Sequence, residues 1–159
     1  MILRDNTYLS QRTTSIRFVL LGLLLLISQT TLAADGRIGL VKTYQPVATA
    51  IRQGVAVKLE VGSEVFEGDT IVTDGNGAVG IIFSDGAVLT LGPSGKLIVE
   101  NFLFKPDERK VSFISRVMKG SVAFMSGAIG RISPGSVQFK TPTATLGLRG
   151  TKILIEVDE

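Results

Sequence analysis

Turn-forming residues recur at a nearly constant spacing through the middle of the chain, and this spacing limits what the chain can fold into. Four such signals, at residues 74–77, 85–86, 93–95 and 106–107, follow one another at intervals of about ten residues. They consist of Gly, Asp, Asn, Ser and Pro, whose backbone preferences suit tight turns. An interval of this length holds one strand and its turn, and the chain from residue 38 onward shows no long stretch with a helical period. The spacing therefore predicts an all-β protein.

Between the turns, apolar side chains alternate with a period of two, as they do in strands that bury one face. The predicted buried faces are Val79/Ile81/Phe83, Leu89/Leu91, Leu97/Val99, Phe102/Phe104, Val111/Phe113/Ser115/Val117, Val122/Phe124, Val137/Phe139 and Ile153/Ile155/Val157. Gly120 is expected to end the strand that begins near Val111, and the glycines and proline of residues 126–136 predict a loop there. Periodicity leaves the architecture open, because a solenoid of stacked short strands and a two-sheet β-sandwich both satisfy it.

Residues 1–33 have the organisation of a secretory signal peptide. Three arginines precede an uninterrupted apolar run over residues 18–27, which is too short to span a bilayer. Small residues then lead to a cleavage site that we place after Ala33. The alternative is an uncleaved anchor that extends through Leu32. Cleavage predicts a periplasmic protein with no membrane insertion.

The composition narrows the classes of function. The chain contains no His and no Cys, so it lacks the commonest general base, thiol nucleophiles, the usual zinc ligands and every disulfide. Cleavage after Ala33 removes three arginines and one aspartate, which lowers the net charge from +3 to +1. A chain with so small a net charge and such an even mixture of signs has no electrostatic field that would attract nucleic acid. We expect no enzyme activity, no cofactor and no nucleic-acid partner.

Three carboxylates stand beside glycine in predicted turns: Asp69, Asp74 and Asp85. An Asp in such a turn usually accepts hydrogen bonds from nearby backbone N–H groups. Residues 74–77 begin like a calcium loop but lack the later ligands, and residues 92–96 lack the spacing of a phosphate-binding loop. We therefore predict no catalytic and no metal site; an enzyme would need a pair of carboxylates that face one cleft.

The most unusual local sequence covers residues 141–151. Pro142 fixes the backbone of a turn or a sheet edge, and Gly147 and Gly150 allow conformations that other residues avoid. Arg149 lies between these two glycines. Its guanidinium can satisfy several backbone carbonyls locally, or bind a carboxylate or phosphate from outside. Structural anchoring is the commoner of the two roles, and both stay open.

Taken in order, these features resemble a FecR-type domain. The residues that carry the resemblance are Gly68 and Asp69, Asp85 and Gly86, Thr141, Pro142, Thr143 and Ala144, and the closing Arg149, Gly150 and Thr151. The resemblance covers residues 58–157, and residues 34–57 are expected to form an N-terminal strand or cap. It implies a periplasmic all-β domain built as a right-handed β-helix-like stack of short strands, which favours that architecture over the two-sheet β-sandwich.

In the best-known members of that family, the domain belongs to a transmembrane regulator that relays the state of an outer-membrane transporter to a cytoplasmic sigma factor. The 17 residues before the apolar run are too few for a cytoplasmic region, so we carry over only the module itself. We expect a non-enzymatic sensing or adaptor module that contacts another envelope protein through strand edges or residues 126–136. The alternative is a periplasmic small-molecule or glycan binding protein in which Arg149 meets an anionic group.

Overall fold

The structure, a computed structural model, describes residues 36–149 and 152–158. The predicted signal peptide, Gly150 and Thr151 lie outside the described residues. The described part of the chain is built from strands with two short helical segments, which confirms the predicted all-β class. The strands are β1 (Arg37–Gln45), β2 (Ala48–Arg52), β3 (Val55–Lys58), β4 (Glu64–Phe66), β5 (Thr70–Thr73), β6 (Ala78–Phe83), β7 (Val88–Leu91), β8 (Lys96–Lys105), β9 (Lys110–Met125), β10 (Val137–Lys140), β11 (Thr145–Gly147) and β12 (Lys152–Val157); the helical segments are η1 (Pro106–Glu108) and α2 (Ala128–Ile132).

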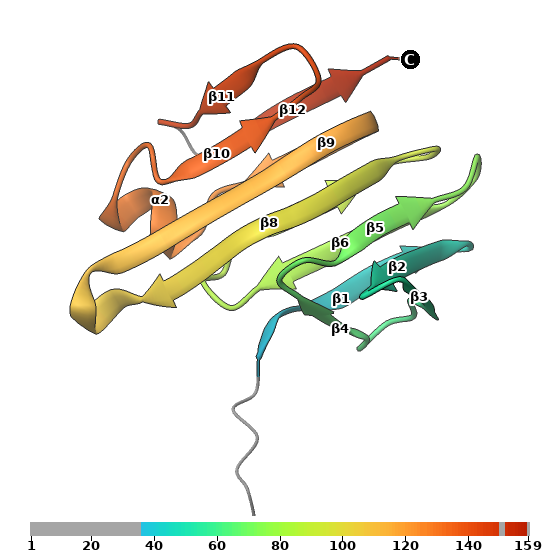
Figure 1. The fold of residues 1–159 in the computed structure, drawn as a ribbon, viewed down its shortest axis with the longest axis horizontal. Helices are drawn as coiled ribbons and strands as arrows, with labels where there is room; N and C mark the ends of the chain where they lie inside the picture. The colour runs from blue at the N-terminus through green and yellow to red at the C-terminus, as the bar shows by residue number, and fades with distance from the viewer. Residues whose placement is uncertain (1–35, 150–151, 159) are drawn as a thin grey trace, which may run out of the picture. The chain divides into compact units, whose positions relative to one another are not determined.

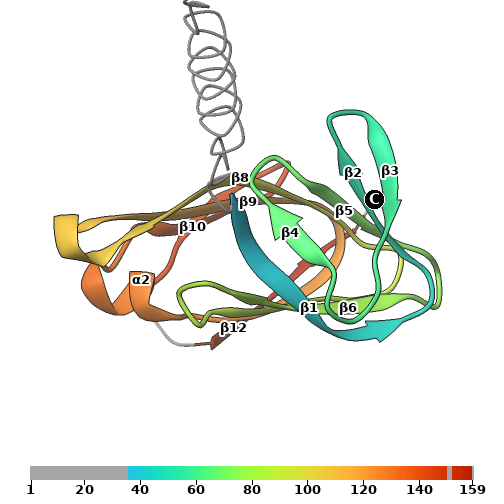
Figure 2. The same cartoon turned by 90° about the horizontal axis from the view of Figure 1, so that it is seen from below.

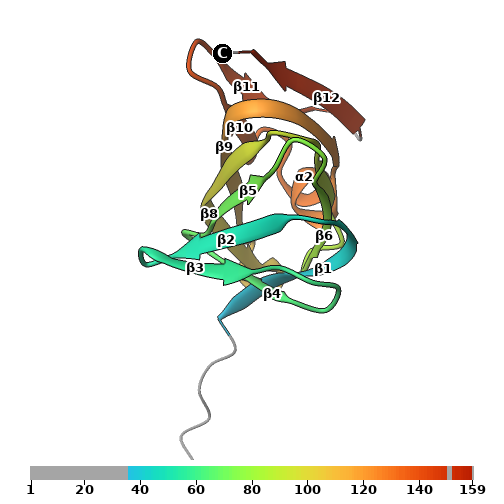
Figure 3. The same ribbon diagram turned by 90° about the vertical axis from the view of Figure 1, so that its right-hand side faces the viewer.

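The strands form one curled open sheet (Figure 1). Its main path runs β3-β2-β5-β8-β9-β7-β6-β1-β4, with β10 and β12 also paired to β9, and β11 paired to β10. Figure 3 shows the sheet curling from β2 through β5 and β8 to β9, and round to β6 and β1. Among the described pairs only β10 on β9 is parallel. The strands that begin the chain therefore belong to the same sheet as those that end it.

The expected right-handed β-helix-like stack is not confirmed. That architecture stacks parallel strands, whereas the neighbours here are antiparallel with one exception. The sheet also differs from a two-sheet β-sandwich, because the single strand β9 runs through both of its halves. Turn spacing and alternation indicate where strands lie and which face of a strand is buried. They carry no information on which strands pair or in which direction.

Strand β9 bends at Gly120 to join the two halves of the sheet. Before this residue β9 pairs with β8 and β10, and from this residue on with β7 and β12. The buried positions change phase at the bend, from odd-numbered Val117 to even-numbered Val122. Gly120 has a φ of +83°, and a Cβ there would lie 2.7 Å from Gly95 Cα. The expectation that Gly120 ends the strand is thus wrong; it redirects the strand.

The two halves of the sheet face each other across a core that contains the predicted buried faces and also side chains of β1, β2, β4 and β5, among them Val41, Ala50, Val65 and Ile71. Phe113 lies near its centre, with ring-centroid distances of 4.9 Å to Phe83, 5.2 Å to Phe124, and 5.8 Å to both Phe102 and Phe139. Phe83 belongs to β6 in one half, whereas Phe102 and Phe139 belong to β8 and β10 in the other. Such pairs are worth about 0.5–1.5 kcal/mol each beyond their burial. The aromatic cluster therefore holds the curl together.

The segment expected as a loop, residues 126–136, contains the short helix α2. Ile129 of this helix is fully buried, so one side of α2 packs on the core while Ile132 is 42% exposed. Across residues 36–149 and 152–158, no helix has the length and apolar character needed to cross a membrane.

Candidate functional site

The path of the curled sheet ends at β3 on one side and at β4 on the other, and Arg52 connects these ends. Arg52 is the last residue of β2, next to β3. Its Nη2 donates to the carbonyl oxygen of Glu64 in β4 at 3.0 Å, and its guanidinium lies 4.1 Å from the centre of the Phe66 ring. We call this region, where Arg52 reaches β4, the seam.

Asp69 is the fully buried partner of Arg52. Its two carboxylate oxygens accept hydrogen bonds from Nε and Nη2 of Arg52, both at 2.9 Å, and Oδ2 also accepts from the Phe66 N–H at 2.9 Å. A forked, charge-assisted pair of this kind is strong and fixes orientation. The prediction that Asp69 accepts from a nearby backbone group is confirmed, and the pairing with a cation 17 residues earlier in the chain adds to it.

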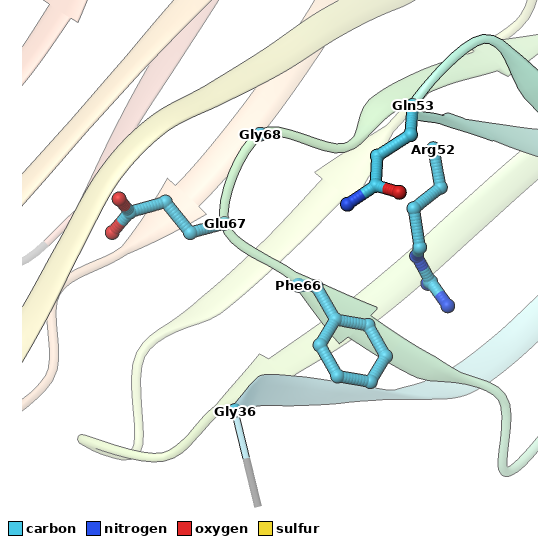
Figure 4. Close-up of a pocket in the computed structure, with 6 residues that line it drawn as sticks. All are labelled: Gly36, Arg52, Gln53, Phe66, Glu67 and Gly68. Atoms are coloured by element: carbon cyan, nitrogen blue, oxygen red, sulfur yellow. The ribbon is translucent and has the colours of Figure 1, made fainter.

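A cavity of about 270 Å³ lies beside the seam and is lined by Gly36, Arg52, Gln53, Phe66, Glu67 and Gly68 (Figure 4). The hydrogen bond to Asp69 raises the pKa of Arg52, so this guanidinium stays charged. Its charge is already balanced by the carboxylate it bonds. Glu67 points away from Arg52 in Figure 4, and its Oε2 accepts from the Phe102 N–H at 2.8 Å. The charged side chains of Arg52, Asp69 and Glu67 therefore bond one another or the backbone.

The turn at Asp85 and Gly86 holds α2 in place. Oδ1 of Asp85 accepts from the Ala87 N–H at 3.0 Å, as predicted for an Asp in a turn. Oδ2 accepts from the Ile129 N–H at 3.2 Å, and the Asp85 carbonyl accepts from the Ala128 N–H at 2.8 Å. Gly86 has a φ of +80°, which favours glycine at this point of the turn. The turn thus fastens the helix to the β6–β7 hairpin.

The residues Thr141, Pro142, Thr143 and Ala144 make the tight connection between β10 and β11. Thr141 N–H donates to the Ala144 carbonyl at 2.8 Å, and Thr141 Oγ1 accepts from the Ala144 N–H at 3.0 Å. Pro142 and Thr143 are exposed at the tip. A shallow hollow is shared by this turn and the end of β12, lined by Thr141, Pro142, Thr143, Glu156, Val157 and Asp158.

Arg149 is exposed, and no hydrogen bond or ion pair joins it to another described residue. The neighbouring Gly150 and Thr151 lie outside the described residues. The buried Leu148 just before it donates its N–H to the Val137 carbonyl at 3.0 Å. The backbone that carries Arg149 is therefore tied to β10, while its side chain faces solvent.

An ion cluster crosses three strands outside the predicted site. Glu100 on β8 accepts from Nζ of Lys140 on β10 at 2.7 Å and from Nε of Arg116 on β9. Both bonds lower the pKa of Glu100, and the bond from Lys140 has the larger effect. The cluster links β8 to β10 across β9 and leaves each charge partly exposed.

The predicted residues that the structure describes thus lie in four places: the seam, the Asp85 turn, the β10–β11 turn and the exposed Arg149 after β11. Asp74, in a further turn, accepts from the Asn76 N–H at 3.2 Å. In the part of the chain that the structure describes, no three His, Cys, Asp or Glu side chains are grouped so as to hold a metal ion. Sequence reasoning missed Arg52 and Phe66. The sequence offered no direct signal for them, because a Gly–Asp turn does not show that its carboxylate is buried and therefore requires a cation or several donors.

Comparison with known proteins identifies a family for part of the chain. A family model described as FecR protein matches residues 69–159, from the buried Asp69 through β12. No curated protein matches the chain. A solved structure described as a cell surface anchoring domain is 30% identical, covers 38% of this chain and 80% of its own, and has a TM-score of 0.37. Strands β1 to β4 lie before the matched residues in the sequence. They join the matched part of the sheet through two pairings, β1 with β6 and β2 with β5.

Proposed function

The chain belongs to the FecR family, and from this membership we propose that it is an exported, non-enzymatic sensing or adaptor module that acts in envelope signalling or assembly through protein–protein contact. FecR domains are periplasmic modules of envelope signalling. The family match over residues 69–159 is the observation that carries the proposal.

Two features of the molecule support a role in contact rather than catalysis. The sequence lacks His and Cys, and the three candidate carboxylates Asp69, Asp74 and Asp85 bond backbone groups in separate turns. In contrast, apolar side chains are exposed on strands at the border of the sheet, among them Val55 at 64% and Leu154 at 73%. Exposed apolar groups on strand edges suit the addition of a partner's strand or loop.

Export through a cleaved signal peptide is part of the proposal and has its own test. The full chain is expressed in a Gram-negative host, and the intact mass of the protein in the periplasmic extract is measured. Cleavage after Ala33 predicts a product that begins at Ala34. A protein that keeps residues 1–33 and sediments with membranes would refute the cleaved leader and favour the anchor.

The contact itself is tested with variants on two exposed surfaces. Envelope extract is passed over immobilised protein, and what binds the wild type is compared with what binds Leu154→Asp on β12 and Ile132→Asp on α2. Both side chains are exposed, so both variants should stay folded, which circular dichroism verifies. One specific envelope protein that is lost with one variant and kept with the other would support the proposal. The proposal is contradicted if the wild type and both variants are folded and abundant and all three retain the same background proteins.

Small-molecule or glycan binding is a second candidate, favoured by the exposed Arg149. An exposed guanidinium can form a forked pair with a carboxylate from outside the protein. Calorimetric titration with glucuronate, a carboxylate-bearing sugar, tests this directly. Binding to the wild type that is absent from a folded Arg149→Ala variant would support the second candidate, and equal heats from both proteins would dismiss it.

A further inference from the structure

Among the residues that the structure describes, strand β3 pairs only with β2 and so presents unpaired backbone groups along its other edge. It pairs with β2 through a two-residue hairpin whose central residues, Gln53 and Gly54, have φ of 49° and 82°. In such a hairpin the flanking residues form a hydrogen-bonded pair, and every second pair along the strands does the same. Leu59 continues this alternation by donating its N–H to the Ala48 carbonyl at 2.9 Å. Ala56 and Lys58 therefore direct their N–H and C=O groups away from β2.

The side chains of β3 alternate in a way that matches this edge. Val55 and Val57 are opposite Arg52 and Ala50, so they face the inner side of the sheet, where Ala50 is fully buried. Yet Val55 is 64% exposed and Val57 37% exposed, because β3 extends past the core. Figure 2 shows the β2–β3 hairpin standing out from the rest of the sheet. An incoming strand would meet free backbone groups and two uncovered valines.

We propose that β3 pairs with β3 of a second copy of this protein, antiparallel and centred on Val57. In this register Ala56 is opposite Lys58 of the second copy, and the reverse, so each copy satisfies both of its outward-facing residues. Val57 meets Val57 of the second copy as a non-hydrogen-bonded pair, in which side chains approach most closely. The edge is its own complement, and this is what selects a second copy as the occupant.

The charges on β3 agree with self-pairing. Lysine on an edge strand ordinarily opposes the addition of another strand. Here Lys58 forms an ion pair with Glu60 of its own chain at 2.9 Å, which offsets its charge. Opposite Lys58 the symmetric register places the small, uncharged Ala56. The pairing thus buries the valines on the inner side without setting like charges directly opposite each other.

The absence of cysteine from the chain allows a test by single substitutions. Val57→Cys puts two thiols across the symmetry axis, where Cα atoms of a non-hydrogen-bonded pair are about 4.5 Å apart, within the span of a disulfide. Val55→Cys is the matched control on the same strand and face, and Val55 is the more exposed of the two. In the symmetric register the two residues at position 55 are about 13 Å apart along the strands, beyond the reach of a disulfide.

Each full-chain variant is oxidised with diamide at low protein concentration and analysed on a non-reducing gel. We expect a covalent dimer from Val57→Cys and monomer from Val55→Cys. Equal cross-linking of the two variants, or none of Val57→Cys, overturns the proposal, and so does a Val57→Cys adduct with a different envelope protein in place of the dimer.

A measurement without thiols completes the test. The molar mass of the exported wild type and of Val57→Asp is followed by sedimentation from low to high concentration. A dimer that Val57→Asp abolishes, and that re-forms when Val57→Asp and Val57→Lys are mixed, supports pairing at this position. A wild type that stays monomeric throughout overturns it. The inference rests on the geometry of β3 and is independent of the proposed envelope function.

Discussion

Removal of the Arg52 side chain tests whether a buried ion pair holds the seam. The Asp69 carboxylate is fully buried and receives two hydrogen bonds from Arg52 and one from the Phe66 N–H. In Arg52→Ala the carboxylate would keep only the backbone donor. Its charge would then lie in the interior without a cation, which is among the most unfavourable arrangements in a folded protein.

The structure sets the size of the effect. Loss of one partner of a buried ion pair costs about 3–5 kcal/mol. Because the Arg52 side chain is 32% exposed, water can enter the space it leaves, so we expect the lower end of that range. Loss of the stacking on Phe66 adds about 0.5–1 kcal/mol. For a domain of this size a loss of about 3–4 kcal/mol lowers Tm by about 12–16 °C.

The assay is urea unfolding at neutral pH, followed by circular dichroism. Lys58→Ala is the matched control, because Lys58–Glu60 has the same distance of 2.9 Å but side chains that are 65% and 63% exposed. An exposed pair contributes about 0–1 kcal/mol. Arg52→Ala should also cost less in an Asp69→Asn background, where no charge is left unpaired. Equal losses for Arg52→Ala and Lys58→Ala would refute the reasoning from burial.

Three further predictions concern the core, the helix anchor and pH. Phe113→Ala should lower the free energy of unfolding by about 3–5 kcal/mol in urea, and a loss under about 1 kcal/mol would contradict its central place in the aromatic cluster. Gly127→Ala should lower the free energy of unfolding by about 1–3 kcal/mol, because its Cβ would overlap backbone atoms of the neighbouring turn. At Gly75 a Cβ would have space, so Gly75→Ala should change the free energy of unfolding by no more than about 0.5 kcal/mol. The bond from Lys140 lowers the pKa of Glu100 in the folded state. The ionised Glu100 therefore stabilises the fold at pH values above its unfolded pKa of about 4.3, and this stabilisation is lost as the pH falls through the folded pKa. Urea midpoints measured from pH 6 down to pH 3 should consequently fall more for the wild type than for Glu100→Gln.

The buried faces of β6 to β10 and of β12 could be predicted from the sequence, because the alternation depends only on neighbours along the chain. Val79, Ile81 and Phe83, for example, are expected on one face and are all at most 2% exposed. The bend in β9 was also encoded, as the change from odd to even buried positions between Val117 and Val122. We interpreted Gly120 as an end because glycine stops and redirects strands alike, and only the partner strands distinguish the two outcomes.

Pairing lies beyond such local reasoning, because it joins segments far apart in the chain. The connection between the parallel strands β9 and β10 contains α2, and this connection lacks the apolar alternation of the strands on either side of it. The same limit applies to the candidate site. Asp69 and Asp85 could be predicted as turn residues, but their partners lie 17 and 44 residues away, in β2 and α2. No spacing rule connects an aspartate in a turn to an arginine in a distant strand.

These distant partners change how the family motif is understood. Asp69 bonds an arginine that reaches β4, and Asp85 bonds the start of α2, so each motif carboxylate fastens one structural element to another. A buried group that is already saturated by such bonds is poorly suited to receive a partner, because binding would first have to break them. The contact that we propose therefore uses groups with bonds still to make, such as the outward backbone of Ala56 and Lys58. It follows that variants at Asp69 should act through stability, whereas variants at Val57 should alter association and leave the fold intact.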